Sequence, residues 1–177
     1  MQSDEELMVA VARGEHDAFR SLYDRHQGSV FRFIARYLAR AAGNRDVDDV
    51  YQETWVRVAR HAGRFDPSRR FTTWLFQIAV NLCRDWHRRQ RPTEPVGDAR
   101  APGDGPAAQE AAQDAAIDAD RLLARLPEAQ RAVLVLRYYH DLSEAEIAGI
   151  LDIPPGTVKS RAHAAVERLR TLVEIQT

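Results

Sequence analysis

The chain has 177 residues, of which 45% are hydrophobic, and its formal net charge is −1. That length suffices for one ordinary domain or two small ones, and the hydrophobic share is enough to bury real cores. The near-neutral total excludes nucleic-acid binding through a bulk basic field, so any such binding must come from local patches. The single cysteine, Cys83, excludes an intramolecular disulfide and a cysteine metal cluster, and we expect it to be a buried or half-buried helical residue.

We expect no secretion signal at the N-terminus, because residues 1–11 contain three acids and no base. No apolar run is long enough to span a bilayer. We therefore expect a cytoplasmic protein with no membrane insertion of its own.

Helices are predicted from the first residues onward. Ser3 and Glu6 fit a capping box, which starts a helix that stops at Gly14. The chain restarts at Asp17, and a helical period then continues through Ala41 to the break at Gly43-Asn44.

The stretch from Asp46 to about His61 predicts a helix with two clearly different faces. Its apolar positions follow a buried-face spacing, at Val47, Val50, Tyr51, Thr54, Trp55 and Val58. The outward positions are Asp49, Gln52, Glu53, Val56 and Arg60. This outward face is either a solvated surface or a docking surface for a basic partner helix, and spacing alone favours the solvated surface.

A short loop from Arg64 to Phe71 precedes a long helix, which we expect to be capped by Thr72 and to end near Arg91. Its apolar side is predicted at Trp74, Leu75, Ile78, Ala79, Leu82 and Trp86. A second stripe becomes steadily more basic, through Gln77, Asn81, Arg84, Arg88 and Arg91. An amide near aromatic residues suits an unstacked base, and arginines beyond it suit a phosphate backbone. An arginine-rich solubilising face is the alternative, and the stripe alone slightly favours it.

Residues 92–118 have the composition of a flexible linker, with four prolines, three glycines, six acids and one arginine. Their net charge of −5 leaves +4 for the remainder, so lobes 1–91 and 119–177 are together mildly basic. The linker is either soluble filler or an acidic segment that lies in a basic channel of a partner.

The second lobe has about 60 residues, so we expect a small core of marginal stability. One helix is predicted around Ile117 to Leu126, and Pro127 opens another. Ser143 and Glu146 then form a capping box, Asp152-Ile153-Pro154 ends that helix, and Pro155 opens the last one. Two capped helices joined by so short a turn predict a helix-turn-helix.

The last predicted helix also has an apolar face and a polar face. Its inward positions are Val158, Ala162, Ala165 and Leu169. Its outward positions are Thr157, Ser160, His163, Ala164 and Glu167, with Lys159 on the flank. Small polar groups and a cation at a helix N-terminus suit a DNA major groove, whereas a solvated face on an ordinary helical hairpin is the alternative.

Three motifs in this order resemble the extracytoplasmic-function group of the bacterial sigma-70 family. They are DVDDVYQETWVRV at 46–58, FDPSRRFTTWLFQIAVNLCRDWHRR at 65–89, and LPEAQRAVLVLRYYHDLSEAEIAGILDIPPGTVKSRAHAAVERLR at 126–170. The resemblance covers nearly the whole chain. It implies an all-α protein of two small helical domains: a region 2-like domain at 1–91 and a region 4-like domain at 119–177, joined by the linker.

The resemblance also implies a role for each group of residues in starting transcription at specific promoters. Core RNA polymerase would be bound by Asp49, Gln52, Glu53 and Val56. A flipped base and the backbone of the −10 element would be bound by Phe65, Ile78, Asn81, Arg84 and Arg88. The −35 element would be bound by Thr157, Lys159, Ser160, Arg161 and His163. Ala164 stands where relatives often have a larger polar residue, which predicts a weaker upstream contact or one with a thymine methyl group.

The family also implies an anti-sigma factor that covers the polymerase-docking surfaces, and no catalytic residue, metal or cofactor. Two other functions are alternatives at the level of the sequence. An autonomous repressor or activator would bind an operator without polymerase, usually as a dimer, but the sequence offers no obvious dimerisation helix. A metal-dependent hydrolase using Asp46, Asp48 and Asp49 lacks a nearby histidine and any recognised metal-ligand spacing.

Overall fold

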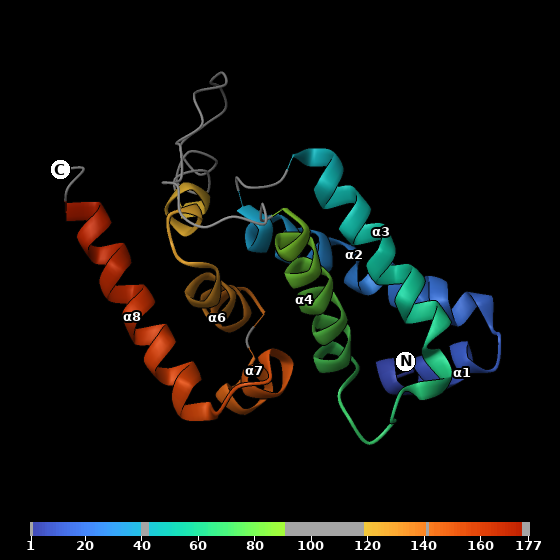
Figure 1. The fold of residues 1–177 in the computed structure, drawn as a ribbon. Helices are drawn as coiled ribbons and strands as arrows, with labels where there is room; N and C mark the ends of the chain where they lie inside the picture. Colours follow the sequence, from blue (N-terminus) through green and yellow to red (C-terminus); the bar gives the residue numbers. More distant parts are fainter. Residues whose placement is uncertain (1, 40–42, 91–118, 141, 175–177) are drawn as a thin grey trace.

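The computed structural model describes residues 2–39, 43–90, 119–140 and 142–174, and every regular element within them is helical. The first lobe contains α1 (Asp4–Ala12), α2 (His16–Leu38), α3 (Asn44–Arg60), the short η2 (Ala62–Arg64) and α4 (Phe71–Gln90). The second contains a helical turn at 119–124, then α6 (Glu128–Tyr139), α7 (Glu144–Leu151) and α8 (Pro155–Glu174) (Figure 1). The all-α class is confirmed. The predicted linker at 92–118, which includes Ile117, lies outside the described residues, as do Ala41 and Arg91.

Local capping signals account for several helix ends. Ser3 and Glu6 form the predicted capping box of α1, and Ser143 and Glu146 form that of α7. Gly14 follows α1 with a φ of 91°, a backbone conformation that favours glycine. The helix-turn-helix is confirmed, because α7 ends at Leu151 and α8 begins at Pro155.

Two predicted boundaries are wrong. Helix α2 ends at Leu38, where Ala39 takes a φ of 50°, instead of continuing to Gly43. Thr72 does not cap α4, because the helix already begins at Phe71. The Phe71 N–H donates to Glu5 Oε1 of α1 over 3.0 Å, so the cap comes from a distant helix.

The core of the first lobe follows the predicted apolar faces. In α3, Val47, Val50, Trp55 and Val58 are buried, and the buried Thr54 hydroxyl donates to the Val50 carbonyl over 2.8 Å. In α4, Cys83 is fully buried as expected, and burial raises the pKa of its thiol. The outward side of α3 remains exposed at Asp49, Gln52 and Val56.

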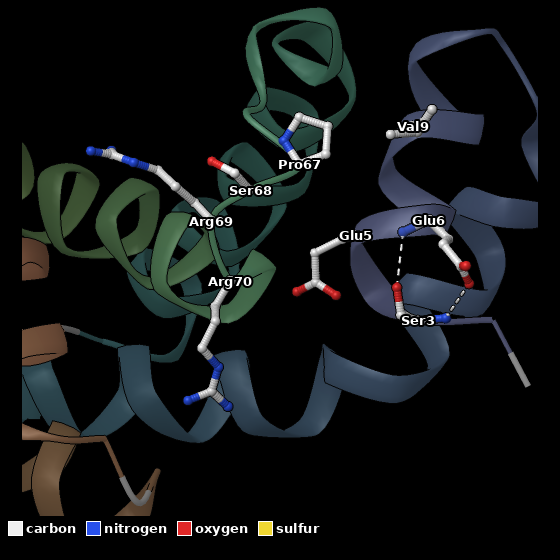
Figure 2. A pocket seen from close by; sticks show the side chains of 8 residues that line it. All are labelled: Ser3, Glu5, Glu6, Val9, Pro67, Ser68, Arg69 and Arg70. Atoms are coloured by element: carbon white, nitrogen blue, oxygen red, sulfur yellow. Dashed lines mark hydrogen bonds between the residues drawn. The ribbon is translucent and has the colours of Figure 1, made fainter.

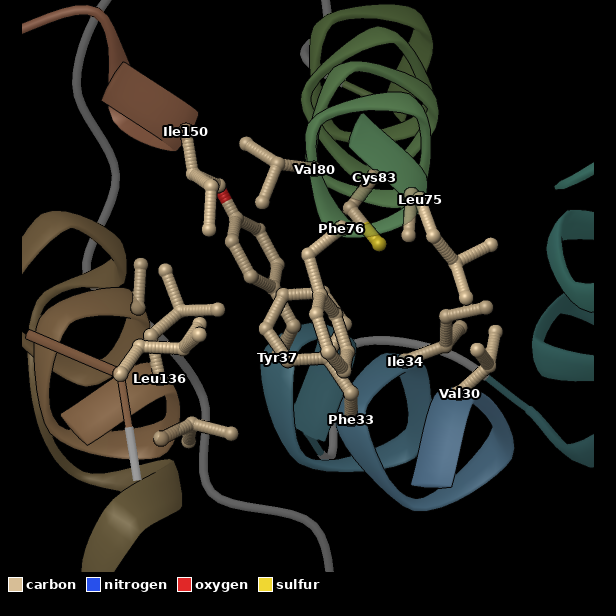
Figure 3. Packing of buried hydrophobic residues seen from close by; sticks show 14 of the residues in the cluster. Val30, Phe33, Ile34, Tyr37, Leu75, Phe76, Val80, Cys83, Leu136 and Ile150 are labelled. Atoms are coloured by element: carbon tan, nitrogen blue, oxygen red, sulfur yellow. The ribbon is translucent and has the colours of Figure 1, made fainter. Parts of the chain in front are cut away.

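The two lobes share one continuous core. Helix α6 packs against α2, and α7 packs against α4. Figure 3 shows Phe33 and Tyr37 of α2 beside Phe76 and Val80 of α4, with Ile150 of α7 across from them. The small second lobe therefore does not rely on its own core alone, because part of its apolar surface is covered by the first lobe.

Candidate functional site

The outward face of α3 has the composition predicted for it. Asp49 and Gln52 are exposed, and Val56 keeps 45% of its surface accessible. Glu53 is half-buried, and its Oε1 accepts from Arg57 Nε over 2.9 Å, an ion pair one turn along the same helix. Spacings of three, four and seven residues place all four side chains on one side of α3, where acids and an amide surround an exposed apolar group.

A groove of about 440 Å³ runs beside this face, between α3 and the C-terminal part of α4. Asp49 and Glu53 line one side of it, and Trp86 and Arg89 line the other. The groove offers carboxylates and an aromatic edge together, a combination that fits a basic protein partner.

The loop before α4 is held by local hydrogen bonds and by aromatic packing. Asp66 Oδ1 accepts from the Ser68 hydroxyl over 2.8 Å and from the Ser68 N–H over 3.0 Å, and these bonds lower the pKa of Asp66. Phe65 is 9% exposed and packs on Phe71 and Trp74 with ring centroids 6.1 and 5.3 Å apart. Phe65 therefore supports this surface from below more than it projects from it.

A second hollow of about 610 Å³ lies between α1 and this loop. Figure 2 shows the Glu5 carboxylate facing the loop, with Arg69 and Arg70 along the other side. The bond from the Phe71 N–H is the main reason that the pKa of Glu5 is lowered. Glu5 thus fixes the point where the loop becomes α4.

Some residues of the predicted stripe on α4 line one hollow, and others do not. Asn81 and Arg88 are exposed, and both line a third hollow of about 610 Å³ together with Arg84. Arg88 also forms an ion pair with Asp85 on its own helix. Arg84 is half-buried and donates to the Leu151 carbonyl of the second lobe over 2.8 Å. Ile78 is half-buried one turn before Asn81, and Phe65 is not among the residues that line this hollow.

The last helix presents the predicted polar face. Lys159, Ser160 and His163 are exposed, whereas Thr157 and Arg161 are half-buried. The Ser160 hydroxyl donates to the Thr157 carbonyl over 3.1 Å. The inward positions Val158, Ala162 and Ala165 are buried and Leu169 is half-buried. The first turns of α8 therefore present a cation, a hydroxyl and an imidazole to the outside.

Sequence reasoning did not identify the residues that join the two lobes. The Tyr37 hydroxyl donates to Glu128 Oε1 over 2.9 Å, and Arg131 Nε donates to the Tyr37 carbonyl over 2.9 Å. Arg131 is only 6% exposed and precedes five consecutive buried residues of α6. The sequence did contain one signal for this contact. A charged residue next to so apolar a run is expected to be buried, and a buried charge requires a partner.

Within residues 2–39, 43–90, 119–140 and 142–174, no three His, Cys, Asp or Glu side chains gather as a metal site would require. In the same part of the chain, no helix combines the length and apolar character needed to cross a membrane.

Comparison with known families locates two matches in this chain. The family "Sigma-70 region 2" matches residues 22–93, and "Sigma-70, region 4" matches residues 117–169. The first match contains α3 and α4, and the second contains the helix-turn-helix.

Similar proteins of known type cover almost the whole chain. The ECF RNA polymerase sigma factor SigM of Mycobacterium tuberculosis is 37% identical, over 97% of this chain and 85% of its own length. SigW of Bacillus subtilis is 32% identical, over 90% of this chain and 91% of its own. The structure of CnrH in complex with the cytosolic domain of CnrY covers 99% of this chain and 100% of CnrH, with a TM-score of 0.77 and 27% identity. The sigma factor RpoE of Bartonella quintana, solved with the anti-sigma factor NepR, shares the fold with a TM-score of 0.68, 20% identity and 90% and 98% coverage. This chain belongs to the extracytoplasmic-function sigma factors of the sigma-70 family.

Proposed function

We propose that this protein directs core RNA polymerase to promoters through three surfaces, each of which binds a different partner. The outward face of α3 binds polymerase, the start and basic stripe of α4 hold the melted −10 element, and the N-terminal turns of α8 bind the −35 duplex. The observation that carries the proposal is the match of regions 2 and 4, in order, to the segments that hold these three surfaces.

Docking on polymerase rests on Asp49, Gln52, Glu53 and Val56. Charged and amide groups around an exposed valine suit an interface with an apolar centre and a polar rim. Their negative charge favours a basic partner helix and speeds its encounter with α3. The Arg57 ion pair holds Glu53 in one orientation before the partner arrives.

Capture of the −10 element rests on Asn81 with Ile78 and on Arg84 and Arg88, above the aromatic support that includes Phe65. An exposed amide hydrogen-bonds the edge of a base outside the stack, and the half-buried Ile78 offers that base an apolar contact. Arginines further along the helix hold the phosphates of the same strand. Capturing a flipped base offsets the few kcal/mol that unpairing costs, which promotes opening of the duplex.

Recognition of the −35 element rests on Thr157, Lys159, Ser160, Arg161 and His163. The major groove of B-DNA is about 12 Å wide and admits a helix such as α8. Lys159 and Arg161 supply cations for phosphates, while Ser160 and His163 can hydrogen-bond base edges.

The proposal extends to the organisation of the chain and its control. Domain boundaries at 1–91, 92–118 and 119–177 keep the three surfaces in two units with a linker between them. The protein acts in the cytoplasm as a binding subunit, and it is not an enzyme. A separate anti-sigma factor covers the α3 face until it is needed. Co-purification of an inhibitor that Gln52→Ala with Glu53→Ala releases would support that control, and full activity in cells with no inhibitor under any condition would contradict it.

Run-off transcription tests the main proposal. Purified core RNA polymerase is given a promoter library with and without this protein, at one stated salt concentration. We expect transcripts that appear only when the protein is added, from templates that share two spaced upstream elements. No stimulation, together with specific duplex binding by the protein alone, would instead favour an autonomous regulator.

A further inference from the structure

The start of α4 is held by a residue from another helix. The backbone N–H of Phe71, the first residue of α4, donates to Glu5 Oε1 of α1 over 3.0 Å. The first N–H groups of a helix have no acceptor within the helix, so this carboxylate takes the place of a capping side chain. The same bond is the main cause that lowers the pKa of Glu5, so the group that caps α4 is charged at neutral pH.

The first turn of α1, which carries Glu5, is fastened to α2. Asp4 Oδ1 accepts from Arg25 over 2.8 Å, and Asp4 Oδ2 lies 2.6 Å from His26 Nε2. Neighbouring residues of a helix point about 100° apart, so Asp4 faces α2 while Glu5 faces the loop before α4, as Figure 2 shows for Glu5. The Glu5 carboxylate therefore projects from a turn that is itself fixed.

The ring of Phe71 connects the same point to the loop and to α2. Phe71 is fully buried, and its ring centroid lies 5.4 Å from that of His26 and 6.1 Å from that of Phe65. Phe65 also packs on Trp74 over 5.3 Å, and Trp74 lies about one turn before Ile78 on α4. The start of α4 and the position of Phe65 thus depend on the same residue, Phe71.

The Glu5 bond bridges α1 and the loop at the edge of a hollow. Residues 67–70 lie across about 610 Å³ from α1, so the loop is not packed directly against α1 there. Without the carboxylate, the Phe71 N–H would lose its acceptor and the first turn of α4 could fray. Fraying would move Phe65 and Trp74 relative to Asn81, which lies seven residues, or about 10 Å, beyond Trp74. Recognition of a base requires its contacting groups to be held within about 0.5 Å.

We propose that Glu5 is a positioning residue for the −10 surface, here meaning Phe65, Ile78 and Asn81. By holding the start of α4, it keeps these three side chains in the arrangement that selects one base. This inference rests on the proposed function of α4. Glu5 acts through the Phe71 N–H and not through contact with DNA.

The test uses the full chain with core RNA polymerase and promoters that differ at single positions of the −10 element found by run-off transcription. Glu5→Ala removes the acceptor of the Phe71 N–H. We expect the ratio of transcription between preferred and substituted promoters to fall about threefold to tenfold, the range for loss of one hydrogen bond. A smaller folded fraction alone would lower transcription from every promoter equally, so it would leave this ratio unchanged.

A conservative variant asks whether the acceptor oxygen is what matters. Glu5→Gln keeps an oxygen that can accept from Phe71 but loses the charge, so we expect the ratio to fall only about twofold. A ratio as low as that of Glu5→Ala would overturn the inference. Each variant should bind core polymerase as wild type does in competition with labelled protein, which confirms that it is folded.

Glu15→Ala is the matched control. It removes an equal charge from an exposed residue shortly after α1, and the Glu15 side chain makes no capping bond to α2. We expect it to keep the wild-type ratio. A fall equal to that of Glu5→Ala would overturn the inference, because loss of negative charge alone would explain it.

A double variant tests whether Glu5 acts through the −10 surface. Asn81→Ala removes the amide proposed to hydrogen-bond the base, so little discrimination at that base is left to lose. We expect Glu5→Ala to lower the ratio less than twofold further in the Asn81→Ala protein, because effects that pass through one contact are not additive. A further loss as large as in the wild-type background would overturn the inference.

The outcomes also separate this inference from the proposed function. Absence of promoter-dependent transcripts with wild type would refute the proposed function, and the positioning role with it. Normal transcripts and a lower ratio in Asn81→Ala, together with an unchanged ratio in Glu5→Ala, would refute only the positioning role.

Discussion

The outward face of α3 and the basic side of α4 belong to the same lobe, yet they differ in their exposure to solvent and in their contacts with the second lobe. Asp49 and Gln52 are exposed and lie on the side of α3 away from its core. Arg84 is half-buried against Leu151, and Arg70 pairs with Glu146. Under the proposed function, the polymerase-docking face is therefore open, whereas two arginines beside the −10 surface already have partners in the second lobe.

The largest effect is expected at the open surface. Gln52→Ala with Glu53→Ala should weaken binding to core polymerase about 100-fold, because truncating these side chains leaves their polar and charged counterparts in the interface without partners. Binding is measured by competition for labelled core polymerase. Asp24→Ala, an exposed acid on α2, is the charge control and should bind normally. Unchanged binding by the double variant would remove α3 from the docking surface.

The α4 surface gives the next largest effect. Asn81→Ala should reduce discrimination between −10 sequences about 10-fold to 100-fold, the range for losing a good hydrogen-bonded contact to a base. Transcription from promoters that differ at single −10 positions measures this ratio. Gln90→Ala removes an exposed amide from the end of the same helix and should leave the ratio as it was. Uniform loss at every promoter would show that Asn81 supports binding without reading a base.

Smaller effects are expected at the outward face of α8, on the second lobe. Lys159→Ala should weaken binding to −35 duplex severalfold for all sequences and reduce the slope of log affinity against log salt by about 1, as expected for one lost phosphate contact. His163→Ala should instead change sequence preference. Arg170→Ala removes an equal charge about 16 Å further along α8 and should alter neither quantity. A sequence-selective loss in Lys159→Ala would reassign Lys159 to base recognition.

Features that depend on residues within a turn or two of one another could be predicted from the sequence. The capping boxes at Ser3 and Ser143 and the buried face of α3 belong to this group, because helical geometry relates their members directly. The family resemblance added roles for exposed residues that spacing alone left open. Contacts between distant segments could not be predicted, since no period links Tyr37 to Glu128 or Glu5 to Phe71. The predicted cap at Thr72 is wrong for this reason.

The Glu5 contact gives the smallest expected effect and tests how the loop before α4 is positioned. Because the hydrogen bond from the Phe71 N–H lowers the pKa of Glu5 from its ordinary value in the folded protein, its ionised form contributes stability at neutral pH, and this contribution is lost as pH falls through that lowered pKa. Glu5→Gln should lower the free energy of unfolding by about 1 kcal/mol at pH 7, or about 2 to 4 °C in Tm, with a smaller difference from wild type at pH 4. Glu6→Gln is the control, because glutamine also completes a capping box. An equal loss at both pH values would show that the carboxylate charge is not what holds the start of α4.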